Sequence, residues 1–259
     1  MGIEGPPETF CYACPMNEKE RFTALAGVYN AGRPGYPPEV GEIIFEGLGD
    51  PSRLVVADLG AGTGTSSMLL AAHGADVRAV EPNAAMRAKA DSHPRVTWVD
   101  GSAEKTTLGD ASVDVVVAFQ AFHWFDPDVT YPEMLRILNP RGRAAIVYYE
   151  RDESDPFAGA YGSLVRKFAT DDTEQRRART RERFALFDEW RSVRQRSVPS
   201  AQSFDRAGIF DRVKSSSYLP HSGPESERLN AEVEALFNEY ARDGKVTMAL
   251  QYLVTIGDR

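Results

Sequence analysis

Short apolar runs alternate with amphipathic segments along most of this chain, and the alternation predicts an α/β fold. The runs that predict buried strands lie at 55–59, 75–81, 95–99, 113–119, 143–150, 191–198 and 246–257. The segments with helical character lie at 18–30, 37–47, 65–73, 82–86, 128–138, 157–190, 204–213 and 225–242. Strands that alternate with helices in this way pack as a mostly parallel sheet.

The first predicted strand ends in the most distinctive segment of the chain, Asp58-Leu59-Gly60-Ala61-Gly62-Thr63-Gly64-Thr65. Glycine has no Cβ, so this turn can bend tightly and bring backbone N–H groups close to a ligand. Residues 65–73 are apolar and alanine-rich, and they predict a helix whose N-terminus faces the same ligand. We therefore expect a nucleotide-like cofactor here; the alternative is a glycine-rich turn without a ligand.

The glycine spacing and two carboxylates indicate which cofactor the turn binds. The dinucleotide fingerprint G-x-G-x-x-G requires a glycine where this chain has Thr65, and the third glycine comes early, at Gly64. A carboxylate at Asp58 would face the pyrophosphate of NAD, whereas S-adenosylmethionine (SAM) has no phosphate and presents an ammonium group. Glu81 ends the second strand and can accept from both ribose hydroxyls in either cofactor. The pattern favours SAM, with NAD as the alternative.

Several segments resemble one family. The pattern D-L-G-x-G-x-G at 58–64 resembles motif I of the class I SAM-dependent methyltransferases, and E-P-N-x-x-M at 81–86 is similar to the family's usual continuation. Two more segments, A-x-H-W-F at 121–125 and Y-x-x-x-R-P-x-Y-P at 29–37, resemble the type 11 branch that includes trans-aconitate methyltransferase-like enzymes. Specific motifs cover roughly residues 28–150, and the remainder matches only by its order of elements.

The resemblance implies a fold and a domain organisation. The fold is Rossmann-like α/β, with a seven-stranded, mostly parallel sheet, helices on both faces and an antiparallel last strand. A helical insertion at about 154–190 is expected to cap the active site and recognise the substrate. Residues 1–36 are expected to form an N-terminal lid segment before the SAM-dependent methyltransferase domain at 37–259.

The same resemblance implies a set of cofactor-binding residues. These are Tyr29, Arg33, Asp58, Gly60, Ala61, Gly62, Gly64, Glu81, Pro82, Met86, Ser102, Ala103, Gln120 and Ala121. Tyr29 and Arg33 would close over the methionine carboxylate of SAM, which an arginine fork suits. Ser102 replaces an aspartate that accepts from the adenine amine, and Met86 either lies against adenine or fills the core.

For the acceptor side, His123 is the catalytic candidate, and His123, Trp124 and Tyr148 are the substrate-binding candidates. The alternative for His123 is a hydrogen bond to the backbone that orders its loop. The expected reaction is direct methyl transfer to a nucleophile, with inversion. A carboxylate needs no base, whereas a carbon, amine or phenol does, and His123 with Tyr148 or Tyr149 would be nearest.

An arginine-rich stretch follows in the insertion. Its members are Arg176, Arg177, Arg179, Arg181 and Arg183. The sequence leaves two alternatives open for these arginines: they contact an acidic substrate, or they form a solvated helix face.

Composition limits the class of partner. A chain of 259 residues suffices for one enzyme-sized α/β domain, and its net charge of −8 argues against broad binding to nucleic acid or anionic membranes. We expect a cytoplasmic monomer or homodimer with no secretory signal and no membrane span. Cys11 and Cys14 form a lone C-x-x-C pair, so no metal site is expected, and a structural or redox role for the pair is the alternative.

The predicted function is SAM-dependent methyl transfer to a small-molecule acceptor, with S-adenosylhomocysteine (SAH) as the product. The reaction is either carboxylate O-methylation or O-, N- or C-methylation of a natural product. Two alternatives come from other classes: a SAM-binding partner protein without transfer activity, and an NAD-dependent oxidoreductase.

Overall fold

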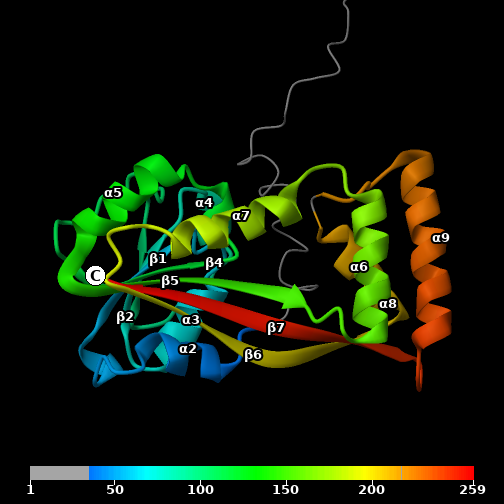
Figure 1. The fold of residues 1–259 in the computed structure, drawn as a ribbon, viewed down its shortest axis with the longest axis horizontal. Helices are drawn as coiled ribbons and strands as arrows, with labels where there is room; N and C mark the ends of the chain where they lie inside the picture. The colour runs from blue at the N-terminus through cyan, green and yellow to red at the C-terminus, as the bar shows by residue number, and fades with distance from the viewer. Residues whose placement is uncertain (1–34, 217) are drawn as a thin grey trace, which may run out of the picture.

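A computed structural model describes residues 35–216 and 218–259, which form one seven-stranded sheet in the order β3-β2-β1-β4-β5-β7-β6 (Figure 1). The strands are β1 (Val55–Leu59), β2 (Asp76–Val80), β3 (Val96–Val99), β4 (Val113–Phe119), β5 (Leu138–Arg151), β6 (Ser192–Asp205) and β7 (Lys245–Asp258). Strands β1 to β5 pair in parallel, and β7 is antiparallel to both of its neighbours. The predicted α/β fold with an antiparallel last strand is confirmed.

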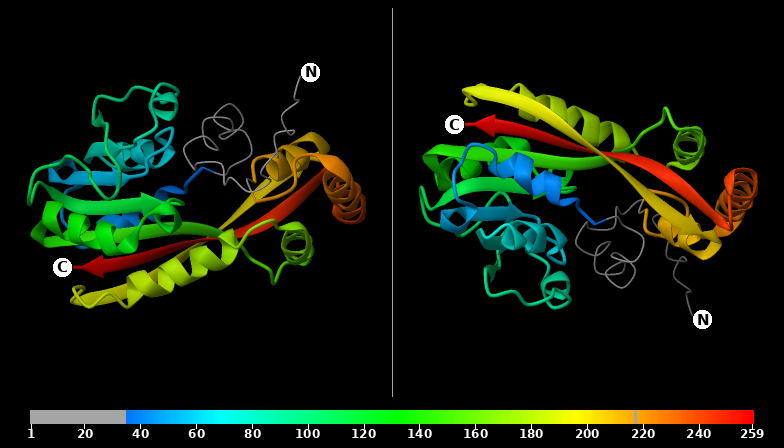
Figure 2. Two further views of the ribbon diagram at one scale, coloured as in Figure 1. Left: turned by 90° about the horizontal axis from the view of Figure 1, so that it is seen from above. Right: turned by 90° about the horizontal axis from the view of Figure 1, so that it is seen from below.

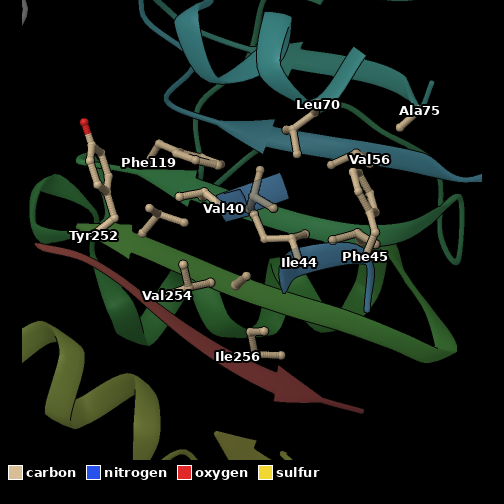
Figure 3. Close-up of a cluster of buried hydrophobic side chains, with 14 of the residues drawn as sticks. Val40, Ile44, Phe45, Val56, Leu70, Ala75, Phe119, Tyr252, Val254 and Ile256 are labelled. Atoms are coloured by element: carbon tan, nitrogen blue, oxygen red, sulfur yellow. The ribbon is translucent and has the colours of Figure 1, made fainter. Parts of the chain in front are cut away.

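Helices cover both faces of this sheet. They are α2 (Pro38–Phe45), α3 (Thr65–Ala72), α4 (Ala84–Arg87), α5 (Pro127–Ile137), α6 (Pro156–Phe168), α7 (Thr173–Ala185), α8 (Arg206–Lys214) and α9 (Gly223–Tyr240), with short 3₁₀ turns η1 (Pro51–Arg53) and η2 (Phe122–Trp124). Helices α2 and α3 pack on one face, where Ile44 and Leu70 meet Val56 (Figure 3). Helices α5 and α7 pack on the other. Because both faces are covered, β4 reads as a continuous apolar run.

A second region lies at one end of the sheet. Strands β6 and β7 pair from Ser192↔Asp258 to Asp205↔Lys245, whereas β5 pairs with β7 only as far as Arg151↔Leu250. The β6–β7 ribbon therefore continues beyond the rest of the sheet, and α6, α8 and α9 pack around its far end (Figures 1 and 2). We call these three helices the helical module. Their core includes Phe157, Leu229 and Phe237.

Three element boundaries differ from the prediction. The helical stretch at 157–190 is two helices: α6 packs in the helical module, whereas α7 returns over the sheet. Strand β6 extends beyond 198 to Asp205, because pairing with β7 holds a polar edge segment that has no apolar run. The segment 139–142, which lies between the helix predicted at 128–138 and the strand predicted at 143–150, belongs to β5, and the register of the β4–β5 pairing shifts between Val113 and Val115.

None of the helices within the described ranges is both long and apolar enough to cross a bilayer.

Candidate functional site

The glycine turn after β1 has the backbone that its sequence predicts. Gly60, Gly62 and Gly64 have φ angles of +68°, +60° and +89°, a region that side chains rarely adopt. The amides of Gly60 and Ala61 donate to the carbonyl of Val80 at 2.9 and 3.1 Å, which ties the turn to the end of β2. Helix α3 begins directly after Gly64, which is its N-cap residue.

The three glycines have different surroundings. A Cβ at Gly60 would lie 2.9 Å from the Ala121 side chain, and one at Gly64 would lie 2.9 Å from the Trp98 ring. A Cβ at Gly62 would meet nothing within 4 Å. Gly60 and Gly64 are therefore required by packing, whereas Gly62 leaves open space above the turn.

Glu81 joins the turns that follow β1 and β2. Its Oε2 accepts from the Gly62 amide at 3.0 Å and its Oε1 from the Asn83 amide at 2.8 Å. Asn83 in turn caps α4, since its Oδ1 accepts from the Ala85 amide at 2.9 Å. A carboxylate oxygen can accept more than one hydrogen bond, so these contacts hold Glu81 in place and are compatible with its accepting from a ligand.

Asp58 is buried beneath the turn. Its Oδ2 accepts from Ser66 Oγ at 2.7 Å and Ser67 Oγ at 2.6 Å, while Oδ1 has no hydrogen-bond partner among the described residues. Burial raises the pKa of Asp58 to about 6. The carboxylate is fully buried and does not line the cavity above the turn.

That cavity has a volume of about 240 Å³ and lies at the carboxyl ends of β1 to β4. Its lining includes these predicted cofactor residues: Gly60, Gly62, Glu81, Pro82, Met86, Ser102, Ala103, Gln120 and Ala121. Trp124, predicted for the substrate, lines it too, whereas Asp58, Ala61 and Gly64 do not. Tyr29 and Arg33 lie outside the described residues, as do Cys11 and Cys14.

Sequence reasoning missed four residues of this cavity, which are Asn83, Glu104, Phe119 and Phe125. Each lies within or directly beside a segment already singled out, so proximity in the chain was an available signal. Asn83 belongs to the E-P-N segment and Phe125 to the H-W-F segment.

Gln120 is strained and polar at the wall of the cavity. It has a φ of +53° and is buried, and neither of its side-chain amide atoms has a hydrogen-bond partner among the described residues. A buried amide without partners is costly, and strained backbone gathers at binding sites. Gln120 is therefore suited to a polar ligand group at the end of β4.

His123 lies in η2 and contacts Tyr148 of β5. Its backbone N–H donates to the Tyr148 hydroxyl at 3.0 Å, and its Nδ1 lies 3.2 Å from the same oxygen. Burial raises the pKa of Tyr148, so the phenol keeps its single proton. The phenol oxygen can accept from the backbone and either donate to Nδ1 or accept from it, according to the tautomer of His123.

Four of the five arginines singled out in α7 form ion pairs. Arg179 pairs with Asp172, Arg183 with Asp128, and Arg181 with Glu150, while Arg176 pairs with Asp172 and also places its guanidinium 5.3 Å from the ring centre of Trp124. Arg177 instead lines a second cavity. Within the part of the chain that the structure describes, no group of three or more His, Cys, Asp and Glu side chains is arranged to hold a metal ion.

Comparisons with known proteins agree with this geometry. A family model described as a methyltransferase domain matches residues 57–146. An uncharacterized methyltransferase of Mycobacterium tuberculosis is 33% identical over 201 residues, which cover 76% of each chain. A demethylmenaquinone methyltransferase of Beutenbergia cavernae is 34% identical over 117 residues, or 44% of this chain and 49% of that one. A solved structure from Anaeromyxobacter dehalogenans, assigned as a type II methyltransferase, shares the fold with a TM-score of 0.65 at 23% identity, covering 87% of this chain and 97% of that one.

Proposed function

Because the chain belongs to the SAM-dependent methyltransferases, we propose that it methylates a small-molecule acceptor bound beside η2. The observation that carries the proposal is the single cavity that brings together Gly62, Glu81, Gln120 and Trp124. This arrangement places groups suited to the cofactor and a residue of the predicted acceptor segment around one space.

The cavity residues fit SAM by their chemistry. Glu81 suits the two ribose hydroxyls, because it is a fixed carboxylate at the end of β2. Met86, Ser102 and Ala103 suit the adenine, and the Gln120 amide suits the polar methionine end. SAM supplies an electrophilic methyl group on a sulfonium. This chain's contribution is to hold that group and the acceptor in a reactive geometry.

His123 is suited to positioning rather than to proton removal. We assign the proton of Tyr148 to its contact with Nδ1, so that the neutral imidazole carries its own proton on Nε2 and that nitrogen is a hydrogen-bond donor. A general base would need a lone pair at the nitrogen that faces the acceptor. This supports an acceptor atom that carries no proton to be lost, such as a carboxylate oxygen, over a phenol or an amine.

The cofactor is tested first by calorimetric titration with SAM, SAH and NAD. We expect SAM and SAH to bind and NAD not to bind. Transfer is then tested with labelled SAM and a panel of small carboxylic acids, phenols and amines. Binding of SAM with no transfer to any class would favour the non-catalytic alternative.

Two variants test His123 once an acceptor is found. His123→Gln keeps an N–H donor, so kcat should stay within about tenfold of wild type, whereas loss of a general base typically costs about 10²–10⁴-fold. His123→Leu removes the donor and should lower kcat more than His123→Gln. A loss of about 10³-fold in His123→Gln, together with loss of an acidic limb in the pH profile, would reverse the assignment.

A further inference from the structure

A second cavity of about 210 Å³ lies beyond the end of β5, where α7 and α8 approach it. Tyr149 and Arg151 of β5, Arg177 of α7 and Arg212 of α8 line it, together with three carboxylates. Residues of the sheet and of the helical module therefore line the same cavity. Among the described residues, none of those predicted for the cofactor lines this cavity.

The three carboxylates of this wall are already paired. Glu150 pairs with Arg181, and Glu174 pairs with Arg151 at 2.5 Å. Glu153 lies 2.6 Å from Arg166 and 3.7 Å from Arg151. The negative charge that lines the cavity is thus matched by arginines other than Arg177 and Arg212.

Arg212 and Arg177 form no ion pair with the described residues. Arg212 is only 7% exposed, and its guanidinium lies beside Tyr149, whose hydroxyl is 3.3 Å away and whose ring centre is 5.5 Å away. Arg177 Nε is buried and has no hydrogen-bond partner among the described residues. A guanidinium does not lose its proton, and a buried charge without a counter-charge is costly. The cavity is therefore built to receive an anion.

The cavity lies on the acceptor side of the predicted cofactor position. Strands in a sheet are spaced by about 4.8 Å, so β5, two strands away, lies roughly 10 Å from β1. A row of packed aromatic rings lies between the two cavities. Phe119 of the first lies 4.7 Å from Tyr36, Tyr36 lies 5.8 Å from Tyr252, and Tyr252 lies 5.9 Å from Tyr149 of the second, all measured between ring centres. An anion here would lie too far from the glycine turn to belong to the adenosine.

We propose that Arg177 and Arg212 form an anchoring subsite for a carboxylate of the methyl acceptor, an inference that rests on the proposed function. Two guanidinium forks match the planar, paired oxygens of a carboxylate and give it charge-assisted hydrogen bonds. The anchored carboxylate is the remote end of the acceptor and is not the atom that reacts. The acceptor is thus an organic acid whose reactive group extends from this cavity toward Trp124.

The test titrates citrate into the complex of the full chain with SAH, by calorimetry at constant ionic strength, with inorganic phosphate in a parallel arm. Wild type should bind citrate, and Arg177→Gln and Arg212→Gln should each weaken it by about 10- to 100-fold. Arg179→Gln is the matched control, because it removes the same charge from an exposed, ion-paired position of α7. Arg177 is only half-buried, so its variant tests the proposal even if Arg212→Gln does not fold.

Three results would overturn the proposal: no citrate binding by a wild-type protein that binds SAH, equal weakening in Arg179→Gln, or tight binding of phosphate with none of citrate. The last would assign the subsite to a phosphorylated ligand. Failure of the proposed function looks different. In that case citrate binding would still depend on both arginines, but labelled SAM would transfer its methyl group to no acceptor in the panel.

Discussion

The two cavities are constructed in different ways. The first depends on backbone geometry and on side chains that directly follow four strands of the sheet. The second is assembled from side chains of β5, α7 and α8, which lie far apart in the sequence. Strand ends converge wherever a parallel sheet forms, whereas the second cavity exists only because the β6–β7 ribbon carries α8 back to β5. The first cavity is thus a property of the fold, and the second is a property of this chain.

The largest expected effect is on the free energy of unfolding, and it tests whether the helical module contributes to stability without contributing to the first cavity. Leu229→Ala truncates a fully buried side chain of α9 and should lower the free energy of unfolding by about 2–5 kcal/mol. The folded variant should keep its SAH affinity, since the first cavity draws no residue from the helical module. Leu70→Ala in α3 is the matched control, equally buried but in the helix that follows the glycine turn. Urea unfolding measures the free energy of unfolding of the two variants, and calorimetry measures their SAH affinity. Equal loss of SAH affinity in the two variants would break the comparison.

Removal of the carboxylate at the end of β2 should weaken binding of the cofactor. Glu81→Ala removes the proposed ribose acceptor and the partner of the Gly62 and Asn83 amides. We expect SAH binding to weaken by roughly 2 kcal/mol or more, about 30-fold. Asp100→Ala, which removes an exposed carboxylate directly after β3, should leave affinity unchanged. Wild-type SAH affinity in Glu81→Ala would remove this residue from the site.

A pair of glycines separates backbone strain from contact with the ligand. Gly62 and Gly49 both have positive φ and open space where a Cβ would be. Alanine at either position should cost about 1–2 kcal/mol of stability. Only Gly62→Ala should also weaken SAH binding, because Gly62 lines the cavity and Gly49 does not. If the two variants bind SAH equally well, the cofactor does not lie over Gly62.

The smallest effect concerns the buried carboxylate beneath the turn. Burial raises the pKa of Asp58 from 3.8 to about 6, so the folded state holds the proton more tightly than the unfolded state does. Asp58 therefore destabilises the protein progressively as pH rises through this range. Asp58→Asn removes that dependence. The free energy of unfolding of the variant relative to wild type should therefore rise by about 1 kcal/mol from pH 5 to pH 8. Urea unfolding of the ligand-free protein measures this. An equal difference at both pH values would contradict the raised pKa.

The sequence singled out most of the residues that line the first cavity, for a physical reason. A strand, a glycine turn and a carboxylate at the next strand end are local features, and a parallel sheet brings its strand ends to one edge. Gly62, Glu81 and Gln120 could therefore be placed together without coordinates. The positions of Tyr29 and Arg33 stay predictions, because these residues lie outside those described.

Only the tertiary structure determined the second cavity. The sequence left open whether five arginines of one segment meet an acidic substrate or form a solvated helix face. In the folded chain four of them pair with carboxylates, whereas Arg177 lines a cavity. Arg212 carried no signal at all, since nothing in its helix distinguishes a buried cation from a solvated one. Whether a charged side chain is matched depends on which remote carboxylates reach it. That is determined by packing between distant segments, which neither periodicity nor local spacing records.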